Sequence, residues 1–106
     1  MWYGVSLLYK SVRTPPESDP PLWEESVRLI RAPTEAEARD VAERIGRSGD
    51  HSYETEDGWV RWTFERIERV FSIGDEELRN GSEVFSRFLK DAEVESLLTP
   101  FSDAVP

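Results

Sequence analysis

The chain has 106 residues, of which 38% are hydrophobic and 11% aromatic, enough to bury the core of one domain spanning residues 1–106. It contains no cysteine, which excludes disulfides, thiolate nucleophiles and cysteine-ligated metal centres. Its net charge of −9 argues against nucleic acid as a partner, because proteins that bind a phosphate backbone concentrate positive charge.

The N-terminal segment MWYGVSLLYKSV is apolar but lacks the basic region and the small-residue cleavage pattern of a signal peptide. Nothing in the chain approaches the 18 consecutive apolar residues typical of a membrane span. We therefore expect a cytoplasmic protein that neither enters nor crosses a membrane.

Two strands are predicted before the first helix. Residues 2–12 alternate with period two, which predicts a half-buried strand with one face formed by Tyr3, Val5, Leu7 and Tyr9. Residues 13–22 contain two proline pairs and predict a surface loop, because proline cannot donate to a strand ladder. The segment LWEESVRLIRA then predicts a second strand, which can pair antiparallel with the first; Glu25 interrupts its apolar face and indicates an edge.

The clearest element is a helix that begins after Thr34. Thr34 followed by Glu37 is typical of a capping box, in which each side chain satisfies a free backbone donor. The apolar stripe expected to face the sheet is Ala38, Val41, Ala42 and Ile45. Gly46 or Gly49 ends this helix.

A hairpin follows, with strands near 51–56 and from residue 59 onward. Asp57 and Gly58 are expected to supply the positive-φ positions of its turn. The second strand loses its alternation after Phe64, which a β-bulge near Glu65 and Arg66 would restore. A helix through FERIERVF fits the same spacing, and we favour the bulged strand.

Residues 82–89 fit either a last strand or the start of a helix, whereas residues 92–98 have helical spacing that stops at Pro100. Residues 99–106 are expected to fray. The predicted fold is therefore α+β, a twisted antiparallel sheet in the order of elements β-β-α-β-β-β, with the main helix on one face and a short C-terminal helix.

Four segments of the chain together resemble a bacterial family known as domain of unknown function 4288. They are WYGVSLL, EESVRLIRAPTEAEARDVAERIG, DGWVRWTFERIERVFSI and NGSEVFSRFL. The resemblance covers nearly the whole chain and involves structural residues. It implies a small bacterial protein and assigns no catalytic residue.

No catalytic or metal site is predicted. His51 is the single histidine, and strand alternation separates it from the carboxylates of Glu54 and Glu56, so the acidic hairpin is interpreted as solvated. The acidic run at 75–77 lacks the spacing of a calcium loop. The carboxylates that acid–base catalysis would need, Glu65, Glu68 and Glu83, lie near arginines at 61, 66 and 69, and structural ion pairs are the favoured interpretation.

The candidate interface consists of aromatic and basic side chains. Trp62 and Phe64 are expected under the helix, whereas Trp59, Arg61 and Thr63 point to the opposite face of the sheet, where Trp2 and Trp23 can join them. Exposed tryptophan and arginine are typical of interface anchors.

The leading hypothesis is a non-enzymatic protein-binding module without a cofactor. It would either self-associate as a homodimer through the second sheet face or present its acidic half to a basic partner, as an immunity or antitoxin-like protein does. The alternative is a small enzyme or ligand-binding protein with a cleft between helix and sheet, using Tyr3, Tyr53, His51 or Glu65.

Overall fold

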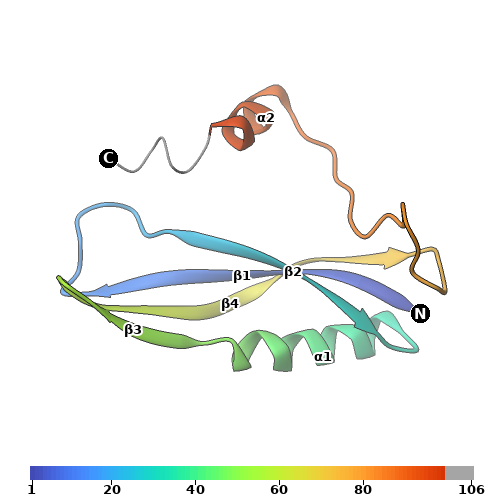
Figure 1. Ribbon diagram of the computed structural model, residues 1–106, viewed down its shortest axis with the longest axis horizontal. Helices are drawn as coiled ribbons and strands as arrows, with labels where there is room; N and C mark the ends of the chain where they lie inside the picture. The colour runs from blue at the N-terminus through green and yellow to red at the C-terminus, as the bar shows by residue number, and fades with distance from the viewer. Residues whose placement is uncertain (100–106) are drawn as a thin grey trace.

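The computed structural model describes residues 1–99, which form one antiparallel sheet and two helices (Figure 1). The strands lie side by side in the order β2-β1-β4-β3, so β2 and β3 are the edges. The α+β class, the main helix and the short C-terminal helix are confirmed. The elements are β1 (Trp2–Thr14), β2 (Trp23–Arg31), α1 (Glu35–Ser48), β3 (His51–Thr55), β4 (Gly58–Ile73) and α2 (Asp91–Leu98).

The core lies between the sheet and α1, which covers one face of β1, β4 and β2. Alternate residues of β1 point into it and are nearly inaccessible to solvent, as the period-two pattern predicts. They are Tyr3, Val5, Leu7 and Tyr9. On α1, Ala38 and Ala42 are fully buried and bring the helix close to the sheet, while Val41 and Ile45 pack beside them.

Local chemistry fixes both ends of α1. At its start, the Thr34 hydroxyl accepts a hydrogen bond from the Glu37 backbone N–H at 3.2 Å, which confirms the predicted N-cap, whereas the Glu37 side chain does not complete the predicted capping box. At its end, Gly49 is the C-cap and donates to the Gly46 carbonyl. Gly46 itself lies inside the helix, where an added Cβ would lie 2.6 Å from the Phe64 ring. The helix can therefore reach Phe64 only because residue 46 has no side chain.

Strand β4 is bulged twice. Its register with β1 shifts between Ser6 and Leu7 and again between Leu8 and Tyr9, which leaves Glu68 and Glu65 unpaired. The bulge at Glu65 is confirmed, and the second was not predicted. Because each bulge restarts the alternation, Phe64, Ile67 and Val70 all pack against the core at a spacing of three. A spacing of three residues also fits a helix, which explains the alternative helical prediction for FERIERVF.

Residues 82–89, predicted to be either a fifth strand or the start of a helix, form neither. Residues 83–90 have no regular secondary structure, and the chain after β4 crosses the sheet on the side opposite to α1 (Figure 1). There the Val84 backbone lies directly over Gly4. A segment that lies across the face of a sheet cannot add to the hydrogen-bond ladder at its edge.

The turn of the β3–β4 hairpin also differs from the prediction. Thr55 pairs with Gly58, so Glu56 and Asp57 form a two-residue loop, and only Gly58 has a positive φ, +139°. Asp57 does not adopt the left-handed conformation. The glycine is required all the same, because a Cβ at position 58 would meet the Thr14 carbonyl.

The proline-rich loop is anchored at its end. Residues 15–22 carry no strand, and the Ser11 hydroxyl exchanges hydrogen bonds of 3.0 Å with the backbone of Leu22. No helix within residues 1–99 is long and apolar enough to cross a bilayer. Pro100 and the tail expected to fray lie outside the described residues, apart from Thr99.

Candidate interaction surface

The side of the sheet that faces away from α1, called the second face below, carries all five predicted site residues. Directly opposite residues of an antiparallel pair share a face, so the register places each of them. Trp59 pairs with Thr14, Arg61 with Val12, and Thr63 with Lys10 on the β4 side; Trp23 pairs with Lys10 and Trp2 with Arg31 on the β2 side.

The five residues do not form one cluster. Trp23 and Thr63 flank Lys10, and Arg61 and Trp59 follow toward the end of β1. Trp2 lies at the other end of the same strand, about 40 Å from the Thr14–Trp59 pair at roughly 3.3 Å per residue. The structure therefore brings four of the predicted residues into one region and leaves Trp2 apart, under the guanidinium of Arg31 at 5.9 Å.

The region around the four residues is called the open patch and consists of Lys10, Val12, Trp23, Trp59, Arg61 and Thr63. Its large apolar members are half exposed, with 49% of Val12, 49% of Trp23 and 51% of Trp59 accessible. Val27 and Leu29 of β2 extend it along the edge strand with similar exposure. Monomeric proteins tolerate scattered apolar residues of this kind, but an aligned group on one face is typical of a contact surface.

Basic side chains are interleaved with the aromatic ones. The Lys10 ammonium lies 5.6 Å from the centre of the Trp23 ring, a cation–π distance. The two bulges direct both Arg66 and Arg69 to the second face, where they pair with Leu8 and Ser6 of β1. A chain whose net charge is −9 thus gathers Lys10, Arg61, Arg66 and Arg69 on one face, beside the carboxylates of Glu25 and Glu54. Sequence reasoning missed this, because with a single bulge Arg69 would not join Arg66.

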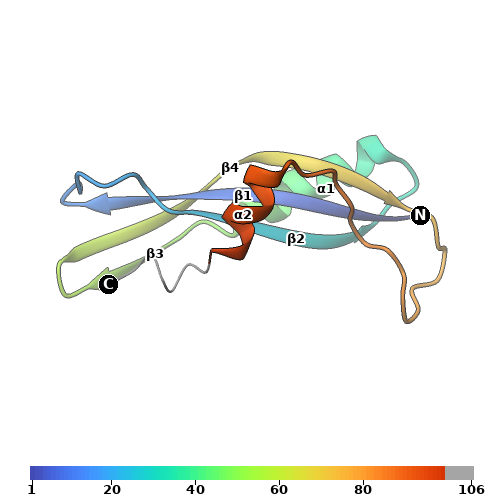
Figure 2. The same cartoon turned by 90° about the horizontal axis from the view of Figure 1, so that it is seen from above.

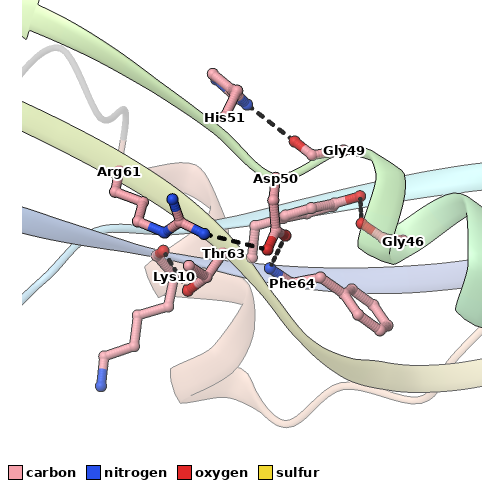
Figure 3. Close-up of polar contacts among 9 residues, drawn as sticks. Lys10, Gly46, Gly49, Asp50, His51, Arg61, Thr63 and Phe64 are labelled. Atoms are coloured by element: carbon pink, nitrogen blue, oxygen red, sulfur yellow. Dashed lines mark hydrogen bonds and ion pairs between the residues drawn. The ribbon is translucent and has the colours of Figure 1, made fainter.

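A polar cluster beside the open patch fixes the position of Arg61 (Figure 3). Asp50, which precedes β3, accepts a hydrogen bond from the Phe64 backbone N–H at 2.6 Å, and its other oxygen lies 3.9 Å from the Arg61 guanidinium. Asp50 thereby extends the pairing beyond His51, the first residue of β3. On the other side of β4, Thr63 donates to the Lys10 carbonyl at 3.4 Å.

Tyr9 connects this region to the helix. Its hydroxyl donates to the Gly46 carbonyl at 2.8 Å, and its ring packs edge-on against Phe64. Burial raises the pKa of the Tyr9 phenol, because a tyrosinate there would lose its hydration. The nearby Arg28 opposes this shift, and the carboxylates of Asp50 and Glu24 add to it.

The other end of the second face is covered by the chain itself. Phe85 packs on Phe71 with ring centres 6.1 Å apart, and Arg69 lies over the Phe85 ring and donates to the Ser86 carbonyl at 3.2 Å. Beneath this segment Ser6 is fully buried and donates to Glu25, which also lies 4.0 Å from Arg87. This covering segment, residues 84–87, ends where the open patch begins.

The alternative cleft between helix and sheet finds little support in the geometry. Tyr3 is buried at one end of β1, whereas His51 and Tyr53 stack on each other on the edge strand near the other end. Glu65 lies on a bulge of β4. These groups do not converge, and no cluster of three metal-ligating side chains occurs within residues 1–99.

A polar pocket is present in the loop that follows β4, where residues 74–79 line it. Asp75 accepts from the Ser82 hydroxyl at 2.9 Å and lies 3.6 Å from Arg79, and the Ser82 hydroxyl accepts from the Arg79 backbone N–H at 3.0 Å. These contacts make Asp75, the first residue of the acidic run, part of a stabilised turn.

Comparison with known families gives one match. The family model described as domain of unknown function DUF4288 matches residues 2–86. The chain belongs to this family. No curated protein and no solved structure matches it. The matched residues include the whole sheet and the start of the covering segment.

Proposed function

We propose that this protein is a non-catalytic protein-binding module that works as a homodimer and uses the second face of its sheet as the interface. The observation that carries the proposal is the open patch, where Trp23, Trp59 and Val12 are half exposed beside Lys10 and Arg61. Tryptophan and arginine are the residues that contribute most binding energy in interfaces. A cytoplasmic location fits a chain without cysteine.

A second copy is the partner that the charge distribution favours. The second face carries Lys10, Arg61, Arg66 and Arg69, while many acidic residues lie elsewhere, for example Glu35 and Glu37 in the first turn of α1. Each copy therefore has basic groups on the second face and acidic groups on other surfaces that complement them. Presentation of the acidic half to a basic partner would use other surfaces and leave the open patch without a role.

Light scattering on the full chain tests the proposal. The wild type is expected to have the mass of a dimer at micromolar concentration, and Trp59→Ser to have the mass of a monomer at the same concentration with little change in its melting temperature. Arg44→Ser, an exposed change on α1 outside the second face, is the matched control and should remain a dimer. A wild type that is monomeric at high concentration would contradict the proposal.

A further inference from the structure

The C-terminal arm, residues 88–99, contains apolar side chains that its own chain leaves uncovered. Phe88 is fully exposed, and 59% of Leu97 and 75% of Leu98 are accessible. Within the described part of the chain, no Cα atom of α2 comes within 8 Å of the strands or of α1. An amphipathic helix of 8 residues is not stable alone in water, so α2 requires a surface to pack on.

The arm extends over the second face without touching it. Figure 1 shows α2 on the side of the sheet opposite to α1, and the view from above in Figure 2 places it over β1 and β2. The covering segment up to Arg87 is anchored on the sheet, and the chain leaves the sheet after it. The uncovered helix and the uncovered patch thus lie on the same side of the molecule.

The arm and the second face are complementary in charge and in polarity. Asp91, Glu93 and Glu95 make α2 acidic, and Val94, Leu97 and Leu98 form its apolar stripe. The open patch has the matching groups, with basic side chains next to half-exposed tryptophans. The acidic arm thus carries charge opposite to that of Lys10 and Arg61 in the open patch.

We propose that the arm of each copy docks on the open patch of a second copy, so that the homodimer forms by reciprocal exchange of C-terminal arms. This inference rests on the proposed function and names the segment that occupies the interface. Exchange of a terminal element between identical chains produces a symmetric dimer in which every contact is made twice.

The structure favours exchange over closure of the arm on its own sheet. Three residues, 88–90, separate Arg87 from α2, and at about 3.3 Å per residue they can span roughly 10 Å, enough to fold the helix back. The arm nevertheless extends away from its own chain. The family match covers residues 2–86 and does not include the arm.

Two full-length double variants and their mixture test the exchange. The arm variant carries Leu97→Ser and Leu98→Ser, which are exposed in the single chain; the face variant carries Trp23→Ser and Trp59→Ser. Each is expected to be a monomer by light scattering where the wild type is a dimer. An equimolar mixture restores one arm–face contact, because the arm variant supplies the intact face and the face variant the intact arm. A heterodimer should therefore form, with an affinity at least tenfold weaker than that of the wild type.

Charge exchange provides a second test that does not depend on removing apolar groups. Glu93→Lys with Glu95→Lys in the arm should abolish the dimer, and so should Arg61→Glu with Arg66→Glu on the face. A mixture of these two charge variants should form heterodimers, whereas each variant alone stays monomeric. Thermal melts of all variants establish that they are folded.

Each other outcome overturns the exchange. If the arm variants dimerise as well as the wild type while the face variants do not, the second face is the interface and the arm takes no part in it, so the proposed function stands alone. If neither mixture forms a heterodimer, the arm–face contact does not exist between chains. If the wild type is a monomer whose Trp59 becomes accessible in the arm variant, the arm closes on its own sheet and both proposals fail.

Discussion

The two faces of β1 show how one strand serves two purposes. Its odd-numbered residues, such as Leu7, are excluded from solvent by α1, which packs on them through small side chains. Its even-numbered residues are mixed in character: Gly4 and Ser6 lie under the covering segment, and Lys10 is half-buried at the open patch. The first face has its complete complement of contacts within the chain. The second face has such contacts at one end only.

The two faces of the sheet therefore contribute differently, one to the stability of the single chain and the other to association. Burial under α1 contributes about 25 cal/mol for each Å² of apolar surface removed from water, and it is complete in the single chain. The half-exposed tryptophans of the open patch provide this hydrophobic stabilisation only when a partner covers them. Substitutions on the first face should therefore lower the free energy of unfolding, and substitutions on the open patch should weaken association.

The largest expected effect contrasts two adjacent leucines of β1. Leu7→Ala should lower the free energy of unfolding by about 3 kcal/mol, because it leaves a cavity in the core under α1. Leu8→Ala, on the second face, should cost about 1 kcal/mol. Chemical denaturation at a concentration where the protein is monomeric gives both values, and equal losses would show that the two faces are packed alike.

The same contrast between the first and the second face applies to two tryptophans of β4. Trp62 packs against the core and donates to the Tyr53 hydroxyl at 3.2 Å, so Trp62→Ser should destabilise the monomer by about 2 kcal/mol. Trp59→Ser should cost less than about 0.5 kcal/mol in the monomer. Thermal melts of dilute samples decide this, and the account is wrong if the order is reversed.

Tyr9, on the first face, makes the stability of the domain depend on pH. Its buried phenol has a raised pKa, so its stabilising contribution is complete below the unfolded-state pKa of about 10 and is lost as the pH rises through the folded-state value. Tyr9→Phe removes the bond to the Gly46 carbonyl and should cost about 1.5 kcal/mol at neutral pH.

The variant should also depend less on pH than the wild type above pH 10 or so. Urea denaturation at neutral and at alkaline pH measures both effects. Parallel losses in the two proteins at alkaline pH would mean that Tyr9 is not the group that titrates.

A smaller effect than that of Tyr9→Phe is expected at the start of α1. Thr34→Ala removes the side-chain acceptor of the Glu37 N–H and should lower the free energy of unfolding by about 1 kcal/mol without altering the fold. Thr34→Ser keeps the acceptor and is the control. If the alanine and serine variants melt together, the cap contributes nothing measurable.

Much of the first face could be predicted from the sequence. The alternation of Tyr3 to Tyr9 and the helical stripe from Ala38 follow directly from the periods of strand and helix, and Thr34 has the chemistry of an N-cap. These signals are local, so one sequence contains them in full. The side of the sheet on which Trp59, Arg61 and Thr63 lie also followed from alternation alone.

The rest depended on contacts between distant segments. The second bulge at Glu68 is set by pairing with β1 and leaves no local signal beyond an apolar spacing of three that a helix shares. The alternation of Val84 and Phe88 predicts a strand over residues 82–89, whereas the Val84 backbone lies across Gly4. The distance between Trp2 and the open patch became clear only from the full length of β1.

Footprinting of the tryptophans by hydroxyl radicals, read by mass spectrometry over a series of protein concentrations, tests the central claim most directly. If a second copy covers the open patch, oxidation of Trp23 and Trp59 should fall together as the wild type passes from monomer to dimer, while oxidation of Trp62 stays constant. Trp23 and Trp59 that remain equally reactive at every concentration would contradict the claim that the second face is an interface.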